Sequence, residues 1–327
     1  MTQLTDRFGR HFPYLRLSLL EACNFHCSYC LPNGYRARDG HSRWLQRDEI
    51  CRLLRAFAAV GMSKLRLTGG EPSLRVDLTE IISDAAAIDG INTIALTTNG
   101  VLLQQRLADW QRAGLTAINI SMDSLDAQNF HRITGHDRGV QVRQGVDLAL
   151  ELGMPVVKIN AVLLRNLNNN ELPQWQEFLQ TRNVTLRFIE LMQTGENGDY
   201  FKRHHLPAEQ LESNLLEQGW MLQARHPEAG PARNYAHPDY QGRIGIIAPY
   251  SKDFCSTCNR LRVTATGDLR LCLFGEFGVA LRPMLQTDAQ QDELIATLHA
   301  QLGIKKASHQ LQDGKTGLIP HLAAIGG

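Results

Sequence analysis

The chain has 327 residues, 43% of them hydrophobic, and a formal net charge of +1. This size allows one large α/β domain with an appendage, or two domains. The near-neutral charge gives no general affinity for nucleic acid or membrane surfaces, so an anionic substrate would have to meet locally placed Arg and Lys. The first residues lack the apolar stretch of a signal peptide, and no apolar run could span a bilayer, which predicts a cytoplasmic protein.

Short apolar runs alternate with longer amphipathic stretches from about residue 13 to residue 192. Strands are predicted at 14–20, 64–70, 91–100, 115–124, 155–164 and 184–192. Helical patterns lie between them, for example at 47–61 and 139–153. Asp77 and Glu80 form a predicted capping pair at the start of another helix. These repeats predict a parallel sheet with right-handed crossovers, either flat or curled into a partial barrel.

Polar motifs stand where the predicted strands end. They are TGGEP (68–72), TTNG (97–100), SMDS (121–124) and ELM (190–192). Because ligands of parallel α/β folds gather at the C-terminal ends of the strands, we expect these motifs to lie around one site.

The pattern changes after residue 195, so we divide the chain into regions 1–195 and 196–327. In the second region we predict a helix at 204–220, a loop at 230–245 and a strand at 244–249. A hairpin is predicted at 261–274 and a last helix at about 288–302.

Three cysteines, Cys23, Cys27 and Cys30, follow the first predicted strand within eight residues. Their thiolates can reach one metal centre from a single loop. Zinc sites and [4Fe–4S] clusters usually take four protein ligands, so this triad leaves one position open. A cluster is the favoured interpretation; zinc with His26 as a fourth ligand is the alternative, although His26 is awkwardly placed inside the loop.

The segment CNFHCSYC (23–30) resembles the signature loop of the radical S-adenosylmethionine (SAM) enzymes. The resemblance implies that the open iron of a [4Fe–4S] cluster chelates SAM, whose reductive cleavage releases a 5′-deoxyadenosyl radical. It also implies that the positions matching the family's cofactor contacts bind SAM, namely Tyr29, Gly70, Ser121 and Met192. Gly69 and Gly70 lack a Cβ, which permits close backbone approach.

A second triad, Cys255, Cys258 and Cys272, again lacks a fourth cysteine. A zinc knuckle is the alternative, but a second open cluster explains the missing ligand better. Arg260 and Arg262 lie two residues apart on a predicted strand, so they point to the same side and form a plausible phosphate clamp.

Further basic residues lie within apolar predicted strands, where they are unusual unless they face a polar cavity or an anion. They are Arg16, Lys64, Arg66 and Lys158. Together with the arginine pair, they could balance a nucleoside triphosphate of charge about −4.

The combination of both triads with these basic residues is similar to the GTP 3′,8-cyclase family of molybdenum cofactor biosynthesis. The similarity is carried by YLRLSLLEACNFHCSYCLP, RLTGGEPSLR, LTTNG, NISMDSLD, RFIELM, DFCSTCNRLRV, LCLFGE and the terminal GG. It implies an α/β fold, a partial TIM-type β/α barrel with a C-terminal extension that carries a second [4Fe–4S] cluster. The implied lyase activity converts GTP to (8S)-3′,8-cyclo-7,8-dihydroguanosine 5′-triphosphate by abstraction of the ribose 3′ hydrogen and attack on guanine C8.

The same resemblance implies residue roles and partners. The positions that would hold GTP are Arg16, Lys64, Arg66, Thr97, Lys158, Arg260, Leu261 and Arg262. Arg16 and a C-terminal tail ending in Gly326-Gly327 would serve turnover. Expected partners are a second copy in a homodimer, a flavodoxin-type reductant and the next enzyme, cyclic pyranopterin monophosphate synthase; no nucleic acid or membrane partner is expected. The alternatives are a peptide-modifying radical SAM maturase and a non-catalytic electron-transfer or zinc module.

Overall fold

A computed structural model describes residues 3–36, 44–225, 229–275, 278–317 and 321–325. In this part of the chain twelve strands form one sheet in the order β12-β11-β10-β1-β2-β3-β4-β5-β6-β9-β8-β7. The strands are β1 Tyr14–Ser18, β2 Lys64–Thr68, β3 Thr93–Thr98, β4 Ala117–Ser121, β5 Val156–Leu163, β6 Thr185–Glu190, β7 Met221–Leu222, β8 Arg233–Ala236, β9 Arg243–Ile247, β10 Arg260–Val263, β11 Asp268–Arg270 and β12 Val279–Ala280.

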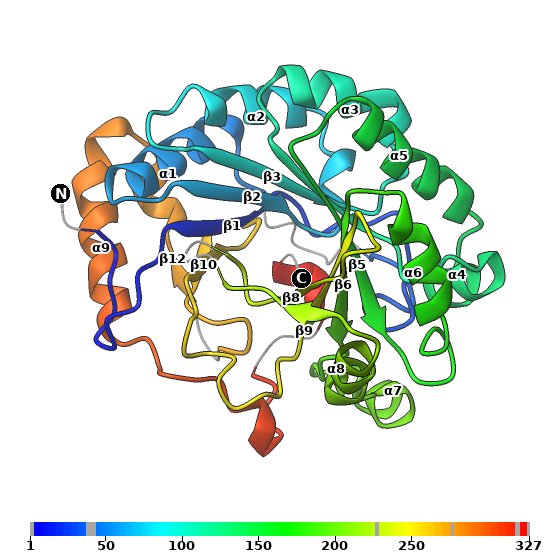
Figure 1. Cartoon of the computed structure of the whole chain (residues 1–327). Coiled ribbons are helices and arrows are strands. Elements are labelled where there is room, and N and C mark those ends of the chain that lie inside the picture. Colours follow the sequence, from blue (N-terminus) through cyan, green and yellow to red (C-terminus); the bar gives the residue numbers. More distant parts are fainter. Residues whose placement is uncertain (1–2, 37–43, 226–228, 276–277, 318–320, 326–327) are drawn as a thin grey trace.

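Strands β1 to β6 are parallel neighbours in chain order, and helices connect them. The sheet curls into an incomplete barrel with helices along its outer side (Figure 1). The helices are α1 Arg47–Ala59, α2 Leu78–Ala86, α3 Leu103–Arg112, α4 Ala127–Thr134, α5 Gly139–Glu151, α6 Leu172–Gln180, α7 Gly198–His204, α8 Ala208–Glu217 and α9 Gln291–Gly303. The six predicted strands, and with them the partial barrel, are confirmed.

Alternation along each strand separates the core from the interior of the barrel. On β5, Val157, Ile159, Ala161 and Leu163 are buried in the hydrophobic core, whereas Lys158, Asn160 and Val162 are less buried. Successive strand residues point to opposite faces, so the second set faces the barrel interior. This arrangement explains why basic residues can interrupt otherwise apolar strands.

The C-terminal region completes the sheet at both edges. Strand β9 pairs in parallel with β6, and β10 pairs in parallel with β1. The register places Arg260 opposite Tyr14 and Arg262 opposite Arg16. Residues that are about 245 positions apart in sequence thus lie side by side. The division of the chain at residue 195 stays a prediction.

Three local predictions were wrong. The predicted loop 230–245 contains β8 and the start of β9. The predicted helix 204–220 is shorter than expected: α8 begins only at Ala208 and ends at Glu217, because Pro207 lacks an N–H and holds the preceding chain extended. Asp77 does occupy the N-cap of α2, but its side chain makes no capping bond; its carboxylate pairs with Arg75 at 2.7 Å instead. No helix of the described part combines the length and apolar character needed to cross a membrane.

Candidate active site

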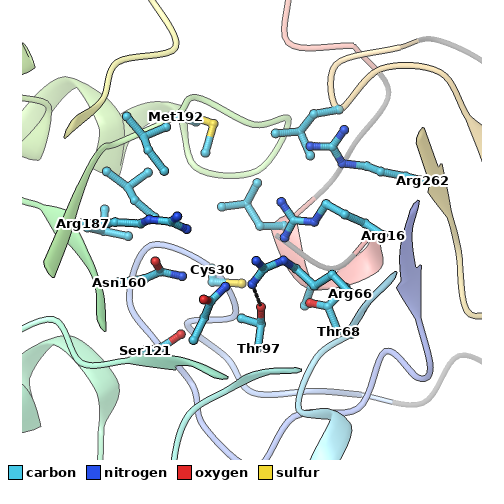
Figure 2. Close-up of a pocket in the computed structure, with 18 of the residues that line it drawn as sticks. Arg16, Cys30, Arg66, Thr68, Thr97, Ser121, Asn160, Arg187, Met192 and Arg262 are labelled. Carbon is cyan, nitrogen blue, oxygen red and sulfur yellow. Dashed lines mark hydrogen bonds between the residues drawn. The ribbon is translucent and has the colours of Figure 1, made fainter. Parts of the chain in front are cut away.

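A cavity of about 280 Å³ lies inside the curved sheet, at the C-terminal ends of its strands. All six cysteines of the two triads line it, as do residues from each of the strands β1 to β6. The four polar strand-end motifs therefore converge, as the sequence predicted. Figure 2 shows side chains from opposite walls pointing into this space.

The first triad lies on the loop that follows β1. The loop is anchored to the end of α4, since Ser28 N donates to Ile133 O at 2.8 Å. Burial is the main cause that raises the pKa of Cys23 to about 12 and that of Cys30 to about 11. Because metal ligation requires thiolates, these thiols need the positive charge of a metal centre to ionise.

Gly69 and Gly70 bring the TGGEP segment against the backbone that leads into the first triad. A Cβ on Gly70 would lie 2.2 Å from Ala22 O, and one on Gly69 would lie 2.4 Å from Leu20 O. Gly70 N donates to Leu20 O, and Glu71 N donates to Ala22 O, both at 2.8 Å. The structure thus gives these glycines a direct packing role beside Cys23, which the sequence did not indicate.

Two buried carboxylates border the first triad. Glu71 accepts hydrogen bonds from Thr98 Oγ1 at 2.7 Å and from Asn99 N at 2.6 Å. Asp123 accepts from Tyr29 Oη at 3.0 Å and from Val162 N at 2.8 Å. Burial raises the pKa of Glu71, and it raises that of Asp123 to about 6. Tyr29 is therefore oriented by Asp123 at the edge of the cavity.

In the second triad the pKa values of two cysteines are lowered, whereas those of the first triad are raised. Burial opposes ionisation of Cys255, but the proximity of His309 and Ser308 outweighs it and lowers the pKa of Cys255 to about 7. For Cys258, the charges of Arg260 and Lys305 outweigh burial and lower the pKa. These thiols are thus prepared to become anionic ligands.

The donor set of each triad fits an iron–sulfur cluster. All six cysteines are free of disulfides. Among the described residues, no three Cys, His, Asp or Glu side chains converge as ligands of one metal ion would. Thiolates are the protein ligands that such clusters take. The ring of His26 packs beside His136, with centroids 4.8 Å apart, and does not line the cavity.

Guanidinium groups from several strands face the same space. Arg16, Arg66, Arg187 and Arg262 point into it from opposite walls (Figure 2). The buried Nε atoms of Arg187 and Arg262 have no hydrogen-bond partner. Burial, followed by neighbouring arginines, lowers the pKa of Arg187 and of Arg262 to about 10. Such a concentration of buried cations requires an anion.

Arg66 is held within the barrel by two hydroxyl groups. Its Nη1 donates to Thr97 Oγ1 at 2.9 Å, and its Nε donates to Tyr14 Oη. Burial would raise the pKa of Tyr14, but the charges of Arg66, Arg16 and Lys64 lower it to about 7. Tyr14 therefore lies at the centre of the cationic wall.

Most predicted site residues meet at this cavity. The predicted SAM contacts Tyr29, Gly70, Ser121 and Met192 all line it, as do the predicted GTP contacts Arg16, Lys64, Arg66, Thr97, Arg260 and Arg262. Leu261 does not, because its side chain packs in the hydrophobic core; it offers only backbone atoms. Lys158 lies two residues before the lining residue Asn160 on the same face of β5. Burial, then Arg187, Arg66 and Lys64, lowers its pKa to about 6.

Sequence reasoning missed several lining residues. Arg187 and Asn160 carry the signal used for Lys158, a polar side chain on the inner face of an apolar strand. Asp123 lies in the strand-end motif SMDS, but the motif alone gave it no role. His309 had no local signal, because it approaches Cys255 only through the fold.

The described end of the C-terminal tail enters the cavity. Leu322 and Ala323 line it, and Leu322 packs with Leu273 and Phe274. The backbone N–H groups of Leu322 and Ala323 lie near the Cys30 thiol and oppose the rise in its pKa that burial causes. In Figure 1 this segment lies within the curve of the sheet. The predicted Gly326-Gly327 pair lies outside the described residues.

Comparison with known proteins agrees with this geometry. Residues 17–179 match the model of the radical SAM superfamily, and residues 184–311 match that of Molybdenum Cofactor Synthesis C. A GTP 3′,8-cyclase of Stenotrophomonas maltophilia (strain K279a) is 64% identical over the full length of both chains. One of Yersinia pestis is 53% identical over the same extent.

Solved structures show the same fold at low sequence identity. The crystal structure of Streptococcus suis SuiB bound to S-adenosylmethionine matches with a TM-score of 0.61 and 12% identity, covering 89% of this chain and 67% of that one. The full-length similarity to the curated relatives is much closer than this shared fold. The chain therefore belongs to the GTP 3′,8-cyclase family of the radical SAM superfamily.

Proposed function

We propose that the protein converts GTP to (8S)-3′,8-cyclo-7,8-dihydroguanosine 5′-triphosphate in molybdenum cofactor biosynthesis. One observation carries the proposal: two open cysteine triads and a wall of buried guanidinium groups line a single cavity. A cluster site alone would serve many radical reactions. The cationic wall selects a highly charged substrate, and a triphosphate matches it.

The first triad would hold the [4Fe–4S] cluster that membership of the radical SAM superfamily implies, with SAM on its open iron. SAM would contact Tyr29, Gly70, Ser121 and Met192. When bound and reduced, this pair supplies a carbon-centred radical for hydrogen abstraction. The chain's own contribution is to orient the reactants, since the Tyr29 hydroxyl is fixed by the buried Asp123.

GTP would lie between the cationic wall and the second triad. Its phosphates would be held by Arg16, Lys64, Arg66, Lys158, Arg260 and Arg262, with Thr97 and the backbone of Leu261 completing the set. These side chains converge from β1, β2, β5 and β10, so they can meet several phosphates at once. Neutralisation by the triphosphate would reverse the mutual repulsion that lowers the pKa of Lys158.

Cys255, Cys258 and Cys272 would hold a second [4Fe–4S] cluster with an open iron that receives the guanine base. The cationic surroundings of Cys258 support this role, because they favour anionic thiolates. A base anchored at one end and phosphates clamped at the other would leave the ribose facing the first triad.

The remaining parts of the proposal concern organisation and partners. Residues 1–195 would form the radical SAM barrel, and 196–327 the substrate region with its terminal Gly326-Gly327. The approach of Leu322 to Cys30 supports a tail that reaches the reacting groups. The protein would act as a cytoplasmic homodimer, take electrons from a flavodoxin-type reductant and pass its product to cyclic pyranopterin monophosphate synthase.

Anaerobic reconstitution tests the proposal. The protein should bind about eight irons and eight sulfides per chain as two cubanes. With dithionite, SAM and GTP it should form 5′-deoxyadenosine and the cyclised nucleotide. Cleavage of SAM that does not respond to GTP would favour a peptide-modifying maturase, and absence of any cleavage would favour the non-catalytic module.

A further inference from the structure

The N-terminal segment before β1 carries an arginine that the active site does not use directly. Arg10 and Asp6 lie in a short hairpin closed by the bridge between Thr5 and His11. The Asp6 side chain is fully buried, and that of Arg10 is 9% exposed. Gly9, at φ +75°, makes the turn between them.

Every donor of the Arg10 guanidinium has an acceptor. Nε donates to Asp6 Oδ2 at 2.7 Å, and Nη2 lies 2.7 Å from the same oxygen. Nη1 donates to Cys255 O at 2.9 Å and to Ala307 O at 2.6 Å, and Nη2 donates to Lys306 O at 2.8 Å. A guanidinium has five N–H donors, and these five contacts engage all of them.

These contacts join two segments that border the second triad. One is the loop between β9 and β10, which contains the proposed ligand Cys255. The other is residues 305–309, which include Ser308 and His309, two residues whose proximity favours the anionic form of the Cys255 thiol. It also carries Lys305, whose buried ammonium donates to Leu271 O, next to Cys272. Arg10 therefore joins the loop that carries Cys255 to residues 305–309.

Asp6 holds the buried Arg10 guanidinium in position. Its carboxylate neutralises the guanidinium and also accepts from Phe8 N at 2.9 Å and from Arg10 N at 3.0 Å. Burial alone would raise the pKa of Asp6, but these bonds lower it, so Asp6 stays charged at neutral pH. Lysine could not replace Arg10, because a single ammonium cannot span three carbonyls and a carboxylate.

The geometry points to Arg10, held by Asp6, as a positioning residue for the second cluster. It fixes the backbone of Cys255 and of residues 306–307 in the places that the cluster requires, without touching cluster, SAM or GTP. This inference rests on the second cluster of the proposed function. It predicts that loss of Arg10 impairs the second site and leaves the first site intact.

The test separates the two sites by their ligands. In full-length protein with Cys23, Cys27 and Cys30 all changed to Ala, only the second site remains, and it should bind about four irons. Adding Arg10→Ala should remove half or more of that iron, and Arg10→Lys should remove nearly as much. Arg7→Ala is the matched control, since Arg7 is exposed in the same hairpin and stacks on Phe8.

The reciprocal background shows whether the variant still folds. With Cys255, Cys258 and Cys272 changed to Ala, Arg10→Ala should keep about four irons at the first site. Loss of iron in both backgrounds would mean general unfolding and would overturn the assignment, as would full retention in the first background. If the first background binds no iron even with Arg10 present, the chain does not hold a second cluster. That result would contradict the proposed function, and it is distinguishable from a failure of the Arg10 role alone.

A measurement on iron-free protein completes the test. Alkylation of each cysteine, mapped by mass spectrometry, should accelerate several-fold at Cys255 in Arg10→Ala and in Asp6→Asn, with no change at Cys30. Equal rates at Cys255 in the variants and the unchanged protein would contradict the positioning role.

Discussion

Gly70→Ala tests the close contact between the TGGEP segment and the first triad. The added Cβ would lie 2.2 Å from Ala22 O and 2.4 Å from Glu21 O. Both are backbone atoms, and the hydrogen bonds from Gly70 N and Glu71 N hold the two segments together. To lengthen the 2.2 Å distance between the new Cβ and Ala22 O to 3.0 Å, the backbone must shift by at least about 0.8 Å. Overpacking of this kind costs about 1–3 kcal/mol.

The shift matters because Ala22 precedes the ligand Cys23. Metal–ligand distances tolerate changes of only about 0.2 Å, so the variant should lose most of the iron of its first site. We expect a lower unfolding temperature of iron-free protein and loss of about four of eight irons after reconstitution.

Gly303→Ala is the matched control for this substitution. Gly303 ends α9, and a Cβ added there would have nothing within 4 Å. Alanine there should leave iron content unchanged and stabilise the helix by at most about 1 kcal/mol. If Gly70→Ala kept full iron and the unfolding temperature of the unchanged protein, the packing role would be refuted.

Three further predictions concern the cationic wall. Arg260→Ala and Arg262→Ala should each raise the KM for GTP at least tenfold, since a charge-assisted bond contributes about 1.5–3 kcal/mol, while iron content stays near that of the unchanged protein; loss of iron would make these residues structural. Tyr14→Phe removes the acceptor of Arg66 Nε, so it should raise the KM for GTP several-fold and leave SAM binding, followed by calorimetry, unaltered; a changed SAM affinity would speak against this assignment. Lys158 has a folded-state pKa of about 6, below its unfolded value of about 10.4, so the unfolded chain binds more protons between these pH values. The stability of nucleotide-free protein should therefore rise with pH across that window, and Lys158→Met should flatten the rise in chemical denaturation at several pH values; an unchanged slope would contradict it.

Local sequence patterns were sufficient for the barrel and for much of the site. Strands β1 to β6 were predicted because buried parallel strands are short apolar runs separated by helical patterns. The inner position of Lys158 and the convergence of Ser121 and Met192 follow from strand alternation and from the shared edge at which parallel strands end. The first triad could be recognised from the sequence because its three cysteines lie in one short loop.

Chain segments with weak or competing local signals were predicted less well. Strand β8 was missed because residues 230–245 are rich in Gly and Pro, and the strand forms only because β9 and β7 provide partners on its two sides. Asp77 was expected to cap α2, but the guanidinium of Arg75 is a stronger partner for its carboxylate than a backbone N–H.

Cysteine spacing and strand periodicity by themselves determined that this protein has two open triads and a β/α barrel with basic residues on its inner face. Only the tertiary structure decided that both triads share one cavity, because pairing of β10 with β1 joins segments about 245 residues apart. It also decided that Gly70 packs on Ala22, that His309 lies near Cys255 and that Arg10 donates to the carbonyl of Cys255. Such contacts depend on how segments far apart in the sequence pack together, and neither the periodicity of a strand nor the spacing of a motif specifies that packing.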